Sequence, residues 1–379
     1  MLFPLTIHFP KEKQMNINFA IIRGDGVGNE LTAATVSVLD AVSQQFSHEF
    51  SYQTALLGGE AFDIEGTPIP GETLEICKNS DAILVGAVGG IKWESEKEHL
   101  RPEKGLSTLK KELGLFTGVQ PIFLHQPLQE FSPLRKDIFS RGCDFVIVRE
   151  LSGGMYSGES GHRKTQFGQE AFDTEIYNVK EIERIARAAF EMALKRRKRL
   201  VSVDKANLMA TGKLWRATVE HISKDYPEVS FTSMLFDECV QRVIVNPVEF
   251  DVILAPNMLG ELLSNVAVNI TGVPQALPCS AMGAKGQRKG IYRSLHPARN
   301  EKEGQDIANP VGTILASAMM LANSFDMFAE CVAIQMAVHN VLSAGFRTPD
   351  ISTRGKKRVS CTEFGTQVAM NILSGKKRK

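Results

Sequence analysis

Residues 18–30 read NFAIIRGDGVGNE, and this stretch decides the fold class. The apolar run Asn18–Arg23 has the length and composition of a buried strand, and the Gly-rich turn Gly24–Glu30 follows it at once. After the turn, apolar residues recur at helical spacing, at Leu31, Val36, Leu39 and Val42. A strand that leads through a tight turn into a helix is the opening unit of an α/β fold.

The same alternation of strands and helices continues along the chain. Further strands are predicted at 82–88 (AILVGAV), 145–148 (FVIV), 200–203 (LVSV) and 252–254 (VIL). The segment Glu181–Arg197 carries an apolar helical stripe directly before the strand at 200–203. We therefore predict an α/β protein with a mostly parallel sheet and helices on both faces.

The glycines of the first turn do not form a dinucleotide fingerprint. The Rossmann motif is G-x-G-x-x-G, and in Gly24–Gly28 the third glycine comes one residue early. We interpret the turn as a tight strand-to-helix connection that needs small residues, and we place no pyrophosphate there.

Composition excludes several classes of protein. The chain has 379 residues, 43% of them apolar and 23% charged, which predicts a globular protein of two domains. A net charge of +1 gives no field that favours nucleic acid or an anionic membrane, and no apolar run is long enough to span a bilayer. The basic run Lys195–Arg199 is interpreted as the cationic end of a helix, and Lys376–Lys379 as a solvated tail.

The six cysteines are scattered and form no Cys-x-x-Cys pair. This spacing argues against a zinc site or a disulfide framework. We expect free, mostly buried thiols and a reducing, cytoplasmic location.

Eight segments together resemble the isocitrate/isopropylmalate dehydrogenase family, and 3-isopropylmalate dehydrogenases most closely. They keep the family's order and spacing from about residue 16 to 370: GDGVGNE (24–30), VGGIKW (88–93), RPEKGL (101–106), VRELSGGMY (148–156), AFDTEIY (171–177), SVDKAN (202–207), NMLGELLS (257–264) and IANP (307–310). The resemblance implies a two-domain fold that is not a true Rossmann fold. It also implies a homodimer whose active sites contain residues of both subunits.

Domain boundaries follow from the same resemblance. Residues 1–14 are interpreted as an N-terminal extension. Residues 15–120 and 271–379 are expected to form the first, cofactor-side domain, and residues 121–270 the second domain, which carries metal ligands and the dimer contacts.

The resemblance implies a base and an acid. Lys205, in VDKAN, matches the family's base, and Tyr156, in GGMY, matches its acid. A lysine can act as a base only if its surroundings favour the uncharged amine. The alternative for both residues is a surface lysine and a core tyrosine without a catalytic role.

Substrate-binding positions depart from the family pattern. Arg149 matches an arginine that grips a substrate carboxylate, although a structural ion pair with Glu150 or another neighbour is the alternative. Lys110 and Gln120 stand where the family has two further arginines, so both guanidinium forks and one positive charge are lost. Leu106 keeps an apolar pocket position and Ser107 replaces one, which predicts a smaller or more polar substrate tail.

The implied metal site is also altered. Asp237, Glu261 and Asn265 stand at three aspartate positions of the family. All three can offer oxygen, which suits Mg²⁺ or Mn²⁺. One negative charge is missing, so weak metal binding is expected, and no metal binding at all is the alternative.

The implied cofactor loop, 296–310, keeps its length and loses most of its small residues. The resemblance assigns cofactor contacts to five positions: Glu103, Asn257, His296, Glu301 and Asn309. Glu301 replaces an aspartate that reads the ribose hydroxyls, which favours NAD over NADP, and Lys302 beside it weakens that preference.

Two functions remain open at this point. The first is NAD-dependent oxidative decarboxylation of a 3-isopropylmalate-like 2-hydroxy diacid with a divalent metal. The second is a catalytically impaired or regulatory paralogue that keeps the fold and binds a small acid or a partner chain. A binding protein unrelated to metabolism is a third, weaker interpretation.

Overall fold

The computed structural model describes residues 14–284 and 286–375. By their internal contacts these residues divide into two compact units. Unit 1 contains residues up to Leu115, His125–Phe131 and the chain from Gly272 onward, and unit 2 contains Phe116–Leu124 and Ser132–Thr271. The predicted domain boundaries at 120/121 and 270/271 stay a prediction, and most of the predicted N-terminal extension lies outside the described residues.

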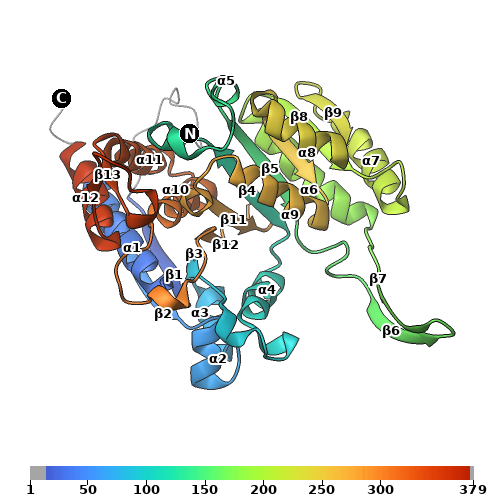
Figure 1. The fold of residues 1–379 in the computed structure, drawn as a ribbon, viewed down its shortest axis with the longest axis horizontal. Helices are drawn as coiled ribbons and strands as arrows, with labels where there is room; N and C mark the ends of the chain where they lie inside the picture. The colour runs from blue at the N-terminus through green and yellow to red at the C-terminus, as the bar shows by residue number, and fades with distance from the viewer. Residues whose placement is uncertain (1–13, 285, 376–379) are drawn as a thin grey trace. The chain divides into compact units, whose positions relative to one another are not determined.

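Unit 1 is built on a mostly parallel sheet in the strand order β2-β1-β3-β12-β11 (Figure 1). All neighbouring strands are parallel except β11 and β12, which are antiparallel. The strands are β1 (Asn16–Gly24), β2 (Glu49–Ala55), β3 (Ala82–Ala87), β11 (Pro278–Met282) and β12 (Gly290–Ser294), with a separate parallel pair, β13 (Phe346–Arg347) and β14 (Lys357–Arg358).

Helices of unit 1 pack on this sheet and on one another. Helix α1 lies against β1 and β3, α10 lies against β12, and α12 packs along α1. The helices are α1 (Gly28–Phe46), α2 (Gly59–Glu65), α3 (Gly71–Asn79), α4 (Pro102–Glu112), α10 (Val311–Phe325), α11 (Phe328–Ser343) and α12 (Cys361–Ser374).

Unit 2 repeats this plan, with four parallel strands and one antiparallel strand in the order β4-β5-β10-β8-β9. Helices α6 and α7 pack together, as do α8 and α9. The elements are β4 (Thr117–Phe123), α5 (Lys136–Phe139), β5 (Asp144–Glu150), α6 (Val179–Leu194), β8 (Arg199–Asp204), α7 (Ala210–Ser223), β9 (Ser230–Leu235), α8 (Phe236–Val245), β10 (Val252–Ala255) and α9 (Asn257–Asn269).

A β-hairpin, β6 (Ser160–Thr165) and β7 (Gly168–Asp173), projects from the rest of unit 2 (Figure 1). None of its strand residues is buried, and Phe167 in its turn is 87% exposed. The sequence does not predict this hairpin, because its strands show no alternation of apolar and polar residues.

The predicted α/β class, with a mostly parallel sheet and helices on both faces, is confirmed. Each predicted strand lies inside an observed one, except that the strand predicted at 82–88 ends at Ala87, and the strands β3 and β10 consist of buried residues. The predicted helix at 181–197 begins slightly earlier, at Val179, because Asn178 and Glu181 form a reciprocal capping box. It ends at Leu194.

The basic run after α6 has a further role beyond the predicted one. Arg196 donates hydrogen bonds to Asp144 and to the fully buried Asp251, and Arg197 binds the backbone carbonyls of Asp144 and Phe250. These arginines tie the beginnings of β5 and β10 to the end of α6. The run lies at the end of α6, as predicted, and these contacts give two of its arginines a further role; the second run, 376–379, lies outside the described residues.

The first turn is tight because the backbone of unit 1 fills the space around its glycines. A Cβ on Gly24 would overlap the carbonyl oxygen of Ala87, and one on Gly26 would overlap that of Ala298. Gly26 also has φ +54°, which other residues rarely adopt. The interpretation as a tight strand-to-helix turn that needs small residues is confirmed, since β1 ends at Gly24 and α1 begins at Gly28.

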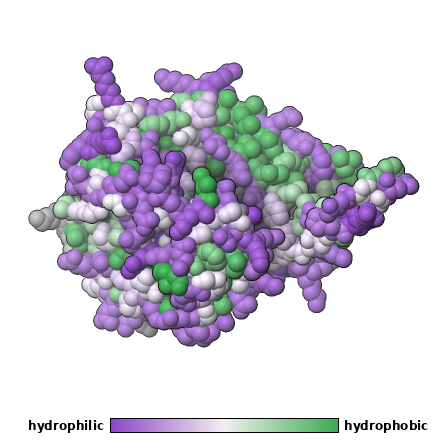
Figure 2. Space-filling view, turned by 60° about the horizontal axis from the view of Figure 1, so that its bottom comes forward, coloured by the Kyte–Doolittle hydropathy of each residue, from purple (hydrophilic) through white to green (hydrophobic). Residues whose placement is uncertain are grey.

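Apolar side chains are also exposed on unit 2. Figure 2 displays a broad hydrophobic area on the face that it shows. Exposed large apolar residues at the end of α8, just after it and on α9 are Ile244, Val245, Val248 and Leu262. The cysteines are free thiols, five of them buried and Cys279 partly buried, as expected. No helix among the described residues is long and apolar enough to cross a bilayer.

Candidate active site

Four neighbouring parallel strands of unit 2 deliver the predicted residues to one edge of the sheet. Arg149 lies at the end of β5, Lys205 directly follows β8, Asp237 lies just after β9, and Asn257 begins α9 after β10. The carboxyl ends of parallel strands meet at the same edge, where α/β proteins usually bind their ligands. The alternating strands and helices are thus the reason that residues far apart in sequence converge.

Arg149 is held by α9. Its Nε and Nη2 donate to Oδ1 of Asn257, at 3.0 and 2.8 Å, and Nη2 also forms a 2.7 Å ion pair with Glu261. Asn257 and Glu261 are four residues apart, so they share one face of the helix. Gly260 allows this approach, because a Cβ there would lie 3.0 Å from Cγ of Arg149. The ion-pair alternative for Arg149 is thus realised with Glu261 rather than Glu150.

Asn257 positions Arg149 in this structure. Besides accepting from Arg149, it donates through Nδ2 to the carbonyl of Gly153, and its backbone N–H donates to the hydroxyl of Tyr177. It is only 2% exposed. Its predicted contact with a cofactor stays a prediction, and its side-chain amide already has partners within unit 2.

Tyr156 lies beside this pair. Its ring centroid is 6.0 Å from Cζ of Arg149, and the residue is 58% exposed. Partial burial, together with the charge of Glu261 and a hydrogen bond to it, raises the pKa of Tyr156. The phenol is therefore protonated at neutral pH and can act as a donor. The alternative of a core tyrosine does not apply to this residue.

Lys205 and Asp237 form a second ion pair. The side chain of Lys205 is 22% exposed and that of Asp237 is 59% exposed. An amine accepts a proton only when it is uncharged, whereas a carboxylate partner stabilises the ammonium form. A role as base therefore requires Asp237 to be drawn away from Lys205.

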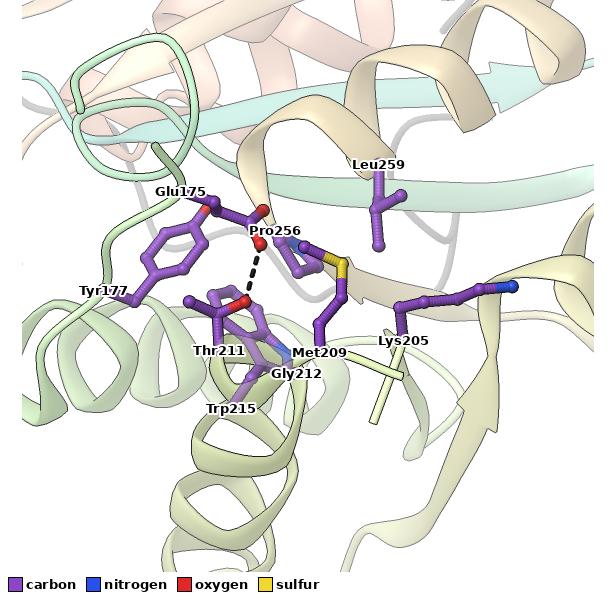
Figure 3. Close-up of a pocket in the computed structure, with 9 residues that line it drawn as sticks. All are labelled: Glu175, Tyr177, Lys205, Met209, Thr211, Gly212, Trp215, Pro256 and Leu259. Atoms are coloured by element: carbon purple, nitrogen blue, oxygen red, sulfur yellow. Dashed lines mark hydrogen bonds between the residues drawn. The ribbon is translucent and has the colours of Figure 1, made fainter. Parts of the chain in front are cut away.

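A small hollow of about 10 Å³, close to the least that a single water molecule needs, lies beside Lys205. Its rim includes the carboxylate of Glu175, which accepts a 2.6 Å hydrogen bond from Thr211, and the side chains of Met209 and Leu259. Figure 3 shows that the amine of Lys205 points away from Glu175 and the other lining residues. The hollow therefore borders the stem of Lys205 and does not receive its reactive end.

The predicted metal ligands offer oxygen from two helices. Glu261 and Asn265 are four residues apart on α9 and share a face, and Asp237 is in the first turn of α8. Both carboxylates are ion-paired, to Arg149 and Lys205. Within residues 14–284 and 286–375, no three His, Cys, Asp or Glu side chains gather as a metal site would require. The donor set fits a hard cation only when Asn265 is counted and the ion pairs open.

Unit 1 carries the predicted residues of α4 on one helical face. Glu103, Leu106, Ser107 and Lys110 follow the spacing i, i+3, i+4, i+7. Glu103 and Ser107 are exposed, whereas Leu106 is only 6% exposed and contributes to the core of unit 1. Only a small part of the Leu106 side chain is therefore accessible to a substrate, and its predicted role in an apolar pocket stays a prediction.

Gln120 lies in β4 of unit 2 and is 8% exposed. Its register partner on β5 is Ile147, and Gly118 is opposite Arg149. Its amide donates to the adjacent Pro121 carbonyl. Gln120 is thus near the end of β5 where Arg149 lies, and its predicted contact with substrate stays a prediction.

The implied cofactor loop is tied to unit 1 chiefly through backbone groups. The N–H of Val27 donates to the Ala298 carbonyl, the N–H of Ala308 donates to the Glu30 carboxylate, and the N–H of Cys361 donates to the Asp306 carbonyl. Burial raises the pKa of Glu30, and burial likewise raises that of Asp25, which accepts from the N–H groups of Glu60 and Gly89. These two acids of the GDGVGNE segment therefore fix loops.

The predicted cofactor residues in this loop differ in availability. Asn309 is fully buried, donates to Asp350 and accepts from the N–H of Val311, so its amide serves the fold. Burial lowers the pKa of His296, whose ring contacts the Pro297 carbonyl and the Asn309 N–H. The ring of His296 is thus neutral at pH 7, and the carboxylate of Glu301 is 64% exposed. The predicted contacts of both residues with a cofactor stay predictions.

The sequence suggested Glu150 only as an alternative ion-pair partner of Arg149, and its role in the structure is a different one. This carboxylate is fully buried and accepts from the N–H groups of Ser152 and Gly153, and Arg184 pairs with it at 3.3 Å. It thereby fixes the loop that leads to Tyr156. An acid two residues before Ser152, in Glu-Leu-Ser-Gly-Gly, is a local signal of such a turn, but the pairing with Arg184 is a long-range contact.

Known proteins resemble this chain along most of its length. The family model described as isocitrate/isopropylmalate dehydrogenase matches residues 18–368. The 3-isopropylmalate dehydrogenase of Geobacillus kaustophilus is 42% identical over 94% of this chain and 96% of its own length. That of Moorella thermoacetica is 44% identical over 94% and 99%.

Solved structures give the same fold. The β-decarboxylating dehydrogenase of Thermococcus kodakarensis in its apo form has a TM-score of 0.75 at 28% identity, over 96% of this chain and 99% of that one. The isocitrate dehydrogenase of Methylococcus capsulatus has a TM-score of 0.80 at 24% identity, over 94% and 99%. At that identity the second likeness concerns the fold alone.

Proposed function

The chain belongs to the isocitrate/isopropylmalate dehydrogenase family, and on that premise we propose that it oxidises and decarboxylates a 2-hydroxy diacid related to 3-isopropylmalate. It is an enzyme of this dehydrogenase type. The observation that carries the proposal is the convergence of Arg149, Tyr156 and Lys205 with three oxygen donors at one edge of the unit 2 sheet.

Each side chain has a step for which its chemistry is suited. Arg149 binds a carboxylate of the substrate, since a guanidinium offers parallel donors to two oxygens. Lys205 removes the proton of the C2 hydroxyl once its amine is uncharged. Tyr156 gives its proton to the carbon that loses CO₂, and its raised pKa keeps that proton in place at neutral pH.

A divalent cation, Mg²⁺ or Mn²⁺, would be held by Asp237, Glu261 and Asn265, and it would offset charge that develops on the C2 oxygen. Because one ligand is an amide and both carboxylates have cationic partners, metal binding is weak. NAD is the proposed hydride acceptor. Glu301 disfavours the 2′-phosphate of NADP by charge repulsion, and His296 offers a flat neutral ring.

The substrate differs from 3-isopropylmalate at its alkyl end. Ser107 is exposed on α4 where an apolar residue is expected, and Leu106 is largely buried. A smaller or more polar tail suits such a surface. The chain acts as a homodimer in the cytoplasm, and the exposed apolar residues of α8 and α9, such as Val245 and Leu262, suit contact with a second copy.

The test is turnover with purified protein, NAD and Mn²⁺ on 3-isopropylmalate and on malates with shorter or hydroxylated tails. NADH formation with an equal amount of CO₂ supports the proposal. Faster turnover on 3-isopropylmalate than on any other diacid contradicts the altered tail. No turnover on any of them overturns the enzymatic proposal and favours the non-catalytic paralogue.

A further inference from the structure

Glu261 touches both groups that are proposed to meet the substrate. Its carboxylate pairs with Nη2 of Arg149 at 2.7 Å, and Tyr156, hydrogen-bonded to Glu261, lies over the same guanidinium at 6.0 Å. A substrate carboxylate would need these same donors. Glu261 therefore stands, in this structure, where an anionic ligand would stand.

The reach of the side chain explains the contact. Asn257 and Glu261 bind Arg149 from one face of α9, and together they engage Nε and Nη2, one complete edge of the guanidinium. A carboxylate that makes a two-pronged contact uses Nη2 together with either Nε or Nη1, so it must compete with Glu261 for Nη2. An aspartate is one methylene shorter and would hold the edge less closely.

Charge balance points to what removes the competitor. The cluster of Arg149 and Glu261 is neutral as it stands, so it attracts a dianion poorly. Glu261 is also the proposed metal ligand on this helix face, beside Asn265. A divalent cation that draws the carboxylate away leaves the guanidinium without its negative partner, although Asn257 still binds it. The cation also adds two positive charges.

We propose that Glu261 is an internal counter-ion that blocks Arg149 in the metal-free protein and releases it for the substrate when a divalent cation binds. The inference rests on the proposed function, since it takes Arg149 and Glu261 as ligands of substrate and metal. It makes the binding of metal and diacid mutually reinforcing, because each is favoured by the state in which Glu261 has left Arg149.

The experiment measures calorimetric binding of 3-isopropylmalate and malate to wild type and E261Q, with EDTA and with saturating Mn²⁺. Glutamine keeps an oxygen and removes the charge. Without metal, E261Q should bind the diacid about three- to fivefold more tightly than wild type, the usual range for a partly exposed ion pair. With Mn²⁺ the order should reverse, because E261Q lacks a charged metal ligand.

The matched control is E249Q. Glu249 forms a partly exposed ion pair of the same length, 2.7 Å, with Arg242 in unit 2, and it precedes β10 whereas Glu261 follows that strand. E249Q should leave diacid binding unchanged under both conditions. E261D, which keeps the charge and shortens the reach, should bind between wild type and E261Q without metal, and it serves as the second variant if E261Q is unstable.

Equal or weaker metal-free binding by both E261Q and E261D, where wild type binds measurably, overturns the counter-ion role and leaves the proposed function intact. Absence of diacid binding by wild type in the presence of Mn²⁺ overturns the proposed function itself, and the inference falls with it. Diacid binding by wild type with Mn²⁺ thus distinguishes the two failures, since it is retained in the first and absent in the second.

Discussion

The edge of the unit 2 sheet and the loop 296–310 of unit 1 both carry residues predicted to belong to the active site. The two regions differ in whether side chains or backbone groups hold those residues in place. In unit 2, charged side chains bind one another, as Arg149 binds Glu261 and Lys205 binds Asp237. In the loop of unit 1, backbone groups take part in most of the contacts, as at Ala298 and Ala308, and the side chains of Asp306 and Asn309 add others. Side-chain pairs constrain residue identity, whereas backbone bonds constrain only chain length. We therefore expect the loop to tolerate more substitutions than the sheet edge.

The largest expected effect is the loss of the base. Lys205→Met removes the amine and keeps the length of the side chain, and kcat should fall by about 10²–10⁴-fold, the usual contribution of a general base. Steady-state NADH formation measures it. Lys213→Met, at an exposed lysine of α7, is the control and should keep full activity. Equal activity of both variants would show that Lys205 is not the base.

The second effect tests the backbone side of the comparison. Gly26→Ala forces a positive φ on alanine and pushes its Cβ into the Ala298 carbonyl, and it should lower the free energy of unfolding by ~2–4 kcal/mol. Denaturant titration measures it. Gly66→Ala, with φ +70° and open space around it, isolates the backbone term and should cost ~1–2 kcal/mol. If side-chain contacts rather than backbone contacts held the loop, both variants would lose the same free energy of unfolding.

The third effect concerns a buried histidine of unit 1. Burial lowers the pKa of His125 to about 4. As pH falls below about 6.5, His125 binds a proton in the unfolded chain but stays neutral in the folded protein. The free energy of unfolding therefore decreases between about pH 6.5 and pH 4, and this group causes no further decrease below about pH 4. This group alone should cost ~3 kcal/mol over that window.

Unfolding of wild type and His125→Gln at several pH values measures this difference. The variant should show a flatter decline between pH 6.5 and 4. His162→Gln, at an exposed position of the hairpin, should reproduce the wild-type slope. Parallel slopes for wild type and His125→Gln would show that another group controls acid stability.

The smallest effect is on coenzyme choice. Glu301→Ala should reduce the preference for NAD over NADP by about tenfold, since one repelled charge is removed near the ribose. The ratio of kcat/KM values measures it. Glu303→Ala, at another exposed acid of the same loop, should leave the ratio unchanged. An unchanged ratio in Glu301→Ala would mean that the loop no longer reads the ribose.

The sequence predicts the strands well because burial and β propensity are local properties, as at 82–88 and 252–254. It also indicates which residues reach the sheet edge. It does not indicate that Asn257 holds Arg149 or that Glu150 fixes the loop before Tyr156. Those roles depend on partners at a distance along the chain, which no local pattern encodes.

The hairpin β6–β7 offers a built-in reporter of assembly. A two-stranded ribbon without a core of its own is marginally stable in water, and Phe167 is a ready cleavage site for chymotrypsin. Digestion at Phe167 should be rapid while the hairpin is exposed to solvent, and slow when another chain covers it. The time course of nicking, followed at falling protein concentration, would then give the association constant without any label.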